Sequence, residues 1–138
     1  MAQVIIHANE LGGVSVTIPA PEFLENNTIE DVKEKDTPSH SIIVDASVLP
    51  IQHSEFFDAW ELNGTTVLVN LTKAKAITKA RLRAEREPLL VAQDVAFQRA
   101  LESGADTAAI VAEKQRLRDI TQLVDVATTL DELKAITP

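Results

Sequence analysis

Apolar residues follow two different periods along this chain, and the change falls near residue 71. The first half carries short β-branched runs bounded by glycine, proline and asparagine, as is typical of strands joined by tight turns. The second half is rich in Ala, Lys, Arg, Glu and Leu, which favour helix. The pattern predicts an α+β fold, with a small antiparallel β-rich lobe over residues 1–71 and a helical region over residues 72–138.

The N-terminal lobe is expected to contain one small, mostly antiparallel sheet. A loop with two glycines, residues 9–13, joins the first two strands, and Asn63-Gly64 between the last two is a strong hairpin signal. The consecutive apolar residues Ile42–Val44 predict a strand that is covered on both faces. Thr28 predicts the capped start of a short helix. The expected strands cover residues 4–6, 14–18, 41–45, 59–62 and 65–69, and the expected helix covers 29–35.

The helical region is expected to form a long helix followed by a helix that returns along it. Thr72 is the predicted N-cap of the long helix, and Gly104 lies in the turn that follows it. Because this turn is short, the two helices should form an antiparallel hairpin. Pro88 removes one helical hydrogen bond, which predicts a kink or a break near residues 85–87. The expected helices are a long helix over 73–102, a return helix over 107–120 and a short C-terminal helix over 130–136, opened by a Thr129–Glu132 capping box.

Charge divides the chain as hydrophobicity does. Residues 1–71 carry 11 acidic and 2 basic side chains, whereas residues 72–138 carry 10 acidic and 11 basic ones. The acidic lobe and the net charge of −8 disfavour nucleic acid as a partner. Residues 73–86 are the exception, with six cations against Glu85 alone. Three explanations stay open for this basic segment: a solvated face, contact with an acidic protein surface, and phosphate binding.

The two long helices offer each other only a narrow apolar seam. In the first, Leu90, Phe97 and Leu101 share a stripe that Asp94 interrupts. The matching positions of the return helix are Ile110, Leu117, Ile120 and Val124, with Lys114 among them. So little burial, at ~25 cal/mol per Å², hardly outweighs the entropy of ordering about 30 residues. The hairpin should therefore need cover from the lobe, from another copy or from a different protein.

The sequence carries no familiar pattern of catalytic or metal-binding residues. The chain has no Cys and no Tyr, its histidines are isolated, and its serines lie in no nucleophile-elbow motif. We therefore expect no enzyme activity, no catalytic residue, no metal site and no cofactor. The apolar runs are far shorter than the roughly 20 residues of a membrane span, and the N-terminus lacks a signal-peptide pattern. Both features predict a protein with no membrane partner.

One stretch of the helical region, residues 81–121, carries a recognisable motif. It contains Arg83-Ala-Glu-Arg86-Glu-Pro-Leu89-Leu90, then Asp94 and Phe97, and beyond the turn Leu117-Arg118-Asp119-Ile120. The motif resembles a module of tailed-bacteriophage tail-assembly chaperones and tail-fibre-assembly proteins, in which Leu-Leu-x-x-x-Asp precedes a helix closing on Leu-Arg-Asp-Ile. Two positions depart from that module: Val95 stands where Trp is common, and Pro88 where a polar residue is frequent.

The resemblance implies an accessory protein that binds other phage tail or tail-fibre proteins, as an assembly chaperone or a minor structural subunit, and that forms a homo-oligomer. It would act in the cytoplasm of the infected bacterium during assembly, or remain in the virion tail. Arg83 and Arg86 would pair with Asp94, Asp119 or carboxylates of a partner. The alternative is a nucleic-acid-binding regulator that uses the basic helix 73–86. The expected partner-binding residues are Arg81, Arg83, Arg86, Leu89, Leu90, Asp94, Phe97, Leu117, Arg118 and Asp119.

Overall fold

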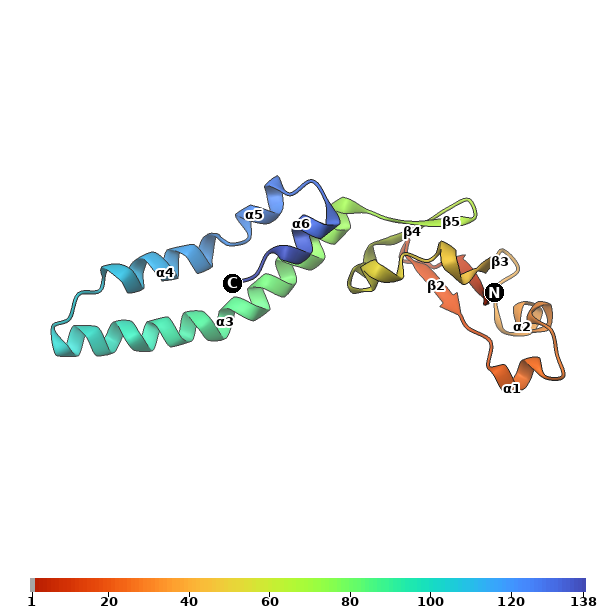
Figure 1. Ribbon diagram of the computed structural model, residues 1–138, viewed down its shortest axis with the longest axis horizontal. Helices are drawn as coiled ribbons and strands as arrows, with labels where there is room; N and C mark the ends of the chain where they lie inside the picture. The colour runs from red at the N-terminus through yellow and green to blue at the C-terminus, as the bar shows by residue number, and fades with distance from the viewer. Residues whose placement is uncertain (1) are drawn as a thin grey trace. The chain divides into compact units, whose positions relative to one another are not determined.

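The computed structural model describes residues 2–138 and consists of two compact units (Figure 1). The division falls between Asn70 and Leu71. The first unit contains antiparallel strands and short helices, and the second contains a 33-residue helix followed by three shorter ones. The predicted α+β class is therefore confirmed.

The strands of the first unit form two sheets, so the prediction of a single sheet is wrong. β1 (Gln3–Ala8) lies between β2 (Val14–Thr17) and β3 (Ile42–Asp45), and both pairings are antiparallel. β4 (Trp60–Asn63) and β5 (Thr66–Val69) pair only with each other. The β4–β5 hairpin packs on a face of the larger sheet instead of extending its edge, because that face is apolar and needs cover.

Side chains along β1 alternate between two cores. Val4 and Ile6 pack against Trp60 of the β4–β5 hairpin, whereas Ile5, which is 0% exposed, packs against α2 (Ile29–Asp36). β3 divides in the same way, with Ile42 and Val44 on one side and Ile43 on the other. Continuous apolar runs thus mark the strands covered on both faces, as predicted for β3.

Local sequence signals place the turns of this unit. The predicted capping box opens α2: Thr28 Oγ1 accepts from the Asp31 N–H, and Asp31 Oδ2 accepts from the Thr28 N–H. The β4–β5 hairpin also forms, but its turn is shifted by one residue, since Asn63 pairs with Thr66. The loop is Gly64-Thr65, and Gly64 supplies the positive φ of +63°.

Three short helical segments of this unit were not predicted. They are α1 (Pro21–Leu24), η1 (Ala46–Val48) and η2 (Ile51–Ala59). The longest of them, η2, is interrupted by non-helical dihedral angles at His53 and Phe56, so its apolar residues follow no helical period. Its position is instead set by the burial of Phe56 and Ala59.

The second unit contains α3 (Leu71–Ser103), α4 (Ala108–Asp119), α5 (Gln122–Val126) and α6 (Leu130–Ala135). α3 begins before Thr72, so Thr72 lies inside the helix and is not its N-cap. Pro88 does not break α3, although the ribbon bends along its length (Figure 1). Pro88 is exposed, so water can reach the carbonyl group that its missing N–H leaves unbonded.

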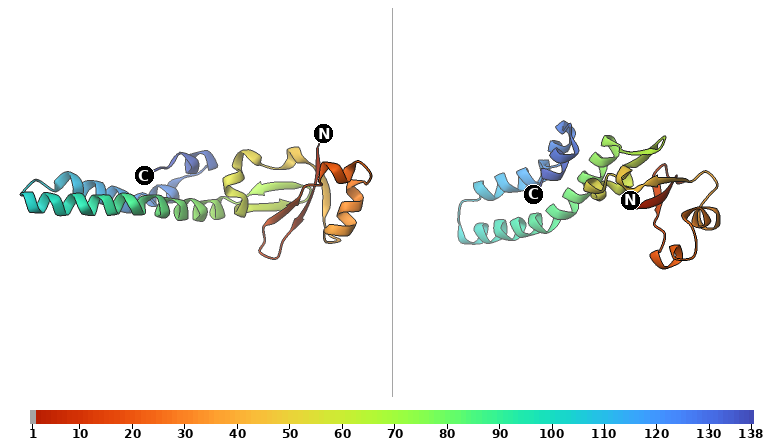
Figure 2. Two further views of the ribbon diagram at one scale, coloured as in Figure 1. Left: turned by 90° about the horizontal axis from the view of Figure 1, so that it is seen from below. Right: turned by 45° about the vertical axis from the view of Figure 1, so that its right-hand side comes forward.

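The turn between α3 and α4 makes them antiparallel, and they run side by side in both views of Figure 2. The Ala105 N–H donates to the Ala100 carbonyl (2.8 Å) and the Gly104 N–H to the Leu101 carbonyl (3.3 Å). These two bonds form a Schellman motif around Gly104, whose φ is +70°. The antiparallel helical hairpin of the prediction is therefore present.

Candidate functional site

The helical unit has a well-buried part and a poorly buried part. We name residues 88–116 the distal hairpin, and residues 71–87 with 117–138 the proximal part. Among residues 88–116, all of which the structure describes, Ala100 alone is buried. The proximal part buries Ala74, Thr78, Leu82, Leu117, Ile120, Val124, Ala127 and Leu133. A core of ordinary quality thus exists only in the proximal part.

Cations of the basic segment bind the ends of the short helices in the proximal part. Arg81 donates to the carbonyl groups of Leu133 (3.2 Å) and Ile136 (2.9 Å) at the end of α6. Arg86 donates to the carbonyl groups of Leu117 (3.4 Å) and Arg118 (2.9 Å) at the end of α4. The last carbonyl groups of a helix lack intrahelical donors and carry partial negative charge, so cations stabilise them.

Two lysines of the same segment bind Asp125, which lies in α5. Lys79 Nζ lies 2.6 Å from the carboxylate, and Lys75 Nζ lies 3.3 Å from the carbonyl oxygen. The hydrogen bond from Lys79 holds the pKa of the Asp125 carboxyl below its usual value, and the charges of Lys79 and Lys75 add to this shift. Lys75, Lys79, Arg81 and Arg86 of the basic segment therefore all have partners inside their own unit.

The predicted seam residues of α3 are only partly covered in the distal hairpin. Leu101 is 55% exposed, and Leu90 and Phe97 are only half-buried. Ala100, next to Leu101, occupies the buried position instead. The predicted stripe therefore forms only part of the seam: Asp94 and Phe97 contact Lys114 of α4, whereas Leu101 stays exposed.

The two charged residues that interrupt the apolar stripes bind each other. Lys114 Nζ lies 2.6 Å from Asp94 Oδ1, and the Asp94 side chain is 61% exposed. The same ammonium group lies 5.1 Å from the centroid of the Phe97 ring, within the range of a cation–π contact. The ion pair between α3 and α4 thus neutralises the two charges that interrupt the apolar seam.

Other expected contacts of the motif residues differ from the structure. Arg86 binds carbonyl oxygens and not the carboxylates of Asp94 or Asp119, and Asp119 accepts from Gln115 Nε2 (2.9 Å). Arg118 is exposed, and its carbonyl group receives Arg86. Arg81 and Arg86 therefore bind groups inside their own unit, and Leu117 is buried in it. The expected partner-binding residues that remain exposed are Arg83, Leu89, Asp94 and Arg118, and Asp94 is already paired.

Sequence reasoning missed a second apolar stripe on α3. Ala84, Pro88, Val91 and Val95 recur at i, i+4, i+7 and i+11, and all four are exposed. The exposed fractions are 53% for Val91 and 46% for Val95. The spacing was visible in the sequence, but nothing local shows which of two stripes on one helix faces solvent.

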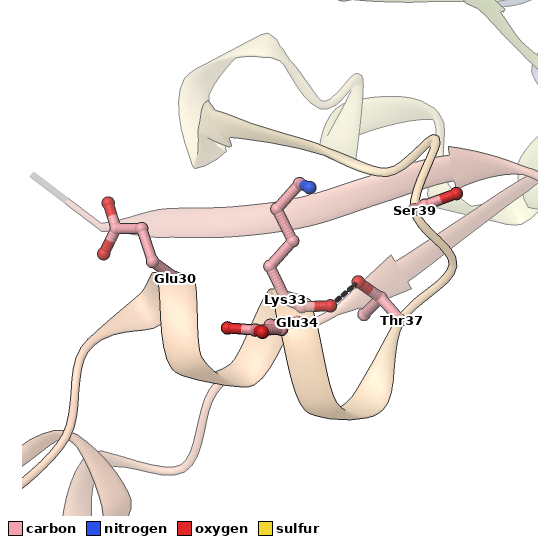
Figure 3. A pocket seen from close by; sticks show the side chains of 5 residues that line it. All are labelled: Glu30, Lys33, Glu34, Thr37 and Ser39. Atoms are coloured by element: carbon pink, nitrogen blue, oxygen red, sulfur yellow. Dashed lines mark hydrogen bonds between the residues drawn. The ribbon is translucent and has the colours of Figure 1, made fainter.

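One hollow on the first unit gathers charged and hydroxyl side chains, but they are not arranged as a reaction centre. It measures about 440 Å³ and lies along α2, lined by Glu30, Lys33, Glu34, Thr37 and Ser39 (Figure 3). Lys33 extends away from Glu34, and the one hydrogen bond drawn runs from Thr37 Oγ1 to the Lys33 carbonyl (2.6 Å). Because the side chains do not converge on one point, they offer no arrangement for acid–base catalysis.

Comparisons with protein-family models, with curated proteins and with solved structures give no match to this chain. Function is therefore inferred from the exposed and buried side chains of the chain itself. Within residues 2–138, no three side chains of the kinds that bind metals gather closely enough to hold an ion. Nor does any helix in that range have the length and hydrophobicity that a membrane span requires.

Proposed function

We propose that this chain is an accessory protein of tailed-phage tails, which binds other tail or tail-fibre proteins and has no catalytic role. The distal hairpin is the observation that supports binding: it buries Ala100 alone yet leaves five large apolar side chains at least 42% exposed. These side chains are Leu89, Val91, Val95, Leu101 and Val111. Val91 and Val95 are four residues apart on α3 and share a face of the helix, and neighbouring exposed apolar side chains can mark a protein-binding surface. The resemblance over residues 81–121 supports the phage tail as the setting.

The size of the effect fits a specific contact. Full burial of a valine side chain contributes about 1.5 kcal/mol. Val91 and Val95 are each about half exposed, so a partner that covered them would gain about half of this free energy from each. Together the two residues supply about 1.5 kcal/mol, or roughly tenfold in affinity. The proposed partner is another tail or tail-fibre protein, with further copies of this chain in a homo-oligomer.

Site-specific crosslinking during phage assembly tests the proposal. A photoreactive amino acid at Val91 or Val95 should crosslink to a tail or tail-fibre protein, identified by mass spectrometry. The same amino acid at Ala76, which is exposed on the proximal part of α3, is the matched control and should give few crosslinks. Equal crosslinking from Ala76, or none from the two valines, would contradict a binding surface on the distal hairpin.

Analysis of purified virions separates the two roles within the proposal. A structural subunit would be present in stoichiometric amounts in the virion tail. An assembly chaperone would act in the cytoplasm of the infected bacterium and be absent from finished particles. Crosslinks to tail proteins combined with absence from virions would support the chaperone.

Binding of nucleic acid by residues 73–86 is the weaker alternative. Lys75, Lys79, Arg81 and Arg86 already bind Asp125 or helix-end carbonyl groups in the same unit. A phosphate backbone would have to displace these contacts. The alternative predicts a complex with DNA or RNA whose affinity falls steeply with salt, and we expect no such complex.

A further inference from the structure

We infer that the first unit has its own protein-binding site, at the turn between β1 and β2, for a surface that presents an apolar side chain flanked by Lys or Arg. The turn covers residues 9–13, at the end of the red hairpin in Figure 2. Leu11 in this turn is 93% exposed, more than any other large apolar side chain of residues 2–138. The site is separate from the distal hairpin, so either proposal can fail without the other.

The turn holds Leu11 in a fixed position despite its exposure. Asn9 Oδ1 accepts from the N–H groups of Leu11 (3.0 Å) and Gly13 (2.9 Å). The Asn9 N–H donates to the Gly13 carbonyl (2.9 Å), and the Gly12 N–H donates to the Asn9 carbonyl (3.1 Å). A bound partner therefore need not order this backbone, which lowers the entropic cost of binding.

Glycine suits two positions of this turn, for different reasons. Gly12 has a φ of +81°, which side chains other than glycine rarely adopt. A Cβ atom at Gly13 would lie 3.2 Å from Asn9 Nδ2, so a side chain there would crowd the amide that holds the turn. The sequence thus builds a rigid turn around an exposed leucine, where a polar residue would be the usual choice.

Phe57 supplies a second apolar contact beside Leu11. Its ring is 41% exposed and lies 4.9 Å, centroid to centroid, from the ring of Trp60, which is 3% exposed. Trp60 Nε1 in turn donates to the His53 carbonyl (3.3 Å). Phe57 is therefore anchored on the core while part of its ring stays available, as is common for aromatic residues that dominate binding energy.

Leu11 and Phe57 line the same hollow, and its size and charge indicate the occupant. The hollow measures about 280 Å³ and is shallow, since Leu11 on its rim is 93% exposed, so it suits one side chain of a protein surface better than an enclosed free ligand. Asp58 also lines it, and the exposed Glu10 is adjacent to Leu11. Because the unit carries 11 acidic and 2 basic residues, the flanking residues of the occupant should be cations.

Methyl NMR of the full chain, with isotope-labelled leucine, tests the inference. The probe is the peptide Lys-Lys-Leu-Lys-Lys with blocked ends. It should shift the Leu11 signals saturably and leave those of Leu68, which is 53% exposed in β5, unchanged. Peptides with serine in place of leucine, or glutamate in place of lysine, should bind at least about fivefold more weakly. Equal shifts at Leu68, or equal binding of either control peptide, would refute the site.

Two variants separate the contact from the rigid turn. Leu11→Ser should weaken binding of the peptide at least about fivefold. Because this variant lacks the Leu11 methyl groups, its binding is followed through the NMR signals of the Phe57 ring. Asn9→Ala keeps both apolar side chains and should weaken binding several-fold because the turn becomes mobile. Unchanged affinity in Leu11→Ser would overturn the site. Shifts of Leu11 that depend on the concentration of the protein itself would identify a second copy as the occupant and overturn the basic partner.

Discussion

In the proximal part of the helical unit α3 buries Leu82 completely, whereas in the distal hairpin the same helix leaves Leu101 55% exposed. The difference does not come from composition, since both parts of α3 contain leucines, alanines and charged residues. It comes from the segments that pack against each part of α3. The ends of three short helices gather around the proximal cations, while the distal part of α3 meets α4 through a seam in which Ala100 alone is buried.

The comparison shows how one helix can combine stability with an open surface. The proximal part buries eight side chains and pairs Lys75, Lys79, Arg81 and Arg86 internally, although Leu123 and Val126 stay exposed. The distal hairpin is tied to it through α3 and needs little stability of its own. A surface attached to an independently stable support is available for binding without first having to fold.

Leucine-to-alanine substitutions in the two parts should give the largest contrast. Leu82→Ala removes a fully buried side chain and should lower the free energy of unfolding by about 2–5 kcal/mol. Leu101→Ala removes a side chain that is 55% exposed and should change it by less than about 0.5 kcal/mol. Urea denaturation followed by circular dichroism at 222 nm measures both. Similar losses would mean that the distal hairpin has a core of its own.

Pro88 marks the start of the distal hairpin and permits the next test. Pro88→Ala restores a helical N–H and should raise the stability of α3 by about 2 kcal/mol. Alanine favours the helix by about 3 kcal/mol over proline, and the greater entropy of the unfolded chain cancels about 1 kcal/mol of that gain. Slower hydrogen exchange of the backbone amides around residue 88 would show this. Glu87→Ala, at the neighbouring exposed position, is the control and should have little effect. Unchanged exchange in Pro88→Ala would mean that Pro88 does not destabilise α3 at this exposed position.

Local signals in the sequence were enough to predict several elements. The Thr28 and Thr129 caps, the two β-hairpins and the helical hairpin all depend on residues within a few positions of each other. The predicted capping box at Thr129 is incomplete, however. A complete box requires the Glu132 carboxylate to accept from the Thr129 N–H, but it accepts from the Thr128 N–H instead (2.7 Å).

Features that depend on distant residues could not be predicted. Sequence spacing shows that the basic segment is charged, but not that Arg81 reaches a carbonyl group 55 positions later. It shows that Asp94 and Lys114 each interrupt an apolar stripe, but not that they pair. α5 was missed for the same reason, since its five residues are too few for a period and Val124 is buried by tertiary packing.

Arg81 tests whether the cations stabilise the proximal part. Arg81→Met keeps the apolar stem but leaves the carbonyl groups of Leu133 and Ile136 without this donor, which should cost about 1–2 kcal/mol. Arg83→Met, at an exposed position two residues on, should cost less than about 0.5 kcal/mol. Thermal unfolding compares the two variants, and proton exchange at α6 should report the loss locally. Equal effects would show that the carbonyl contacts of Arg81 add nothing to stability.

Asp125 gives the smallest effect and a dependence on pH. The hydrogen bond from Lys79 lowers the pKa of folded Asp125, so the unfolded chain, with a carboxyl pKa of about 3.9, takes up a proton first as the pH falls. The stability from this contact is therefore complete above about pH 5 and is lost as the pH falls through about 4 toward the folded pKa. In Asp125→Asn the free energy of unfolding should fall less steeply over this range. Lys79→Met should flatten the dependence in the same way, and combining both changes should add nothing, because each removes the same contact. Additive effects would show that Asp125 and Lys79 act separately, and that the proximal part does not depend on their pairing.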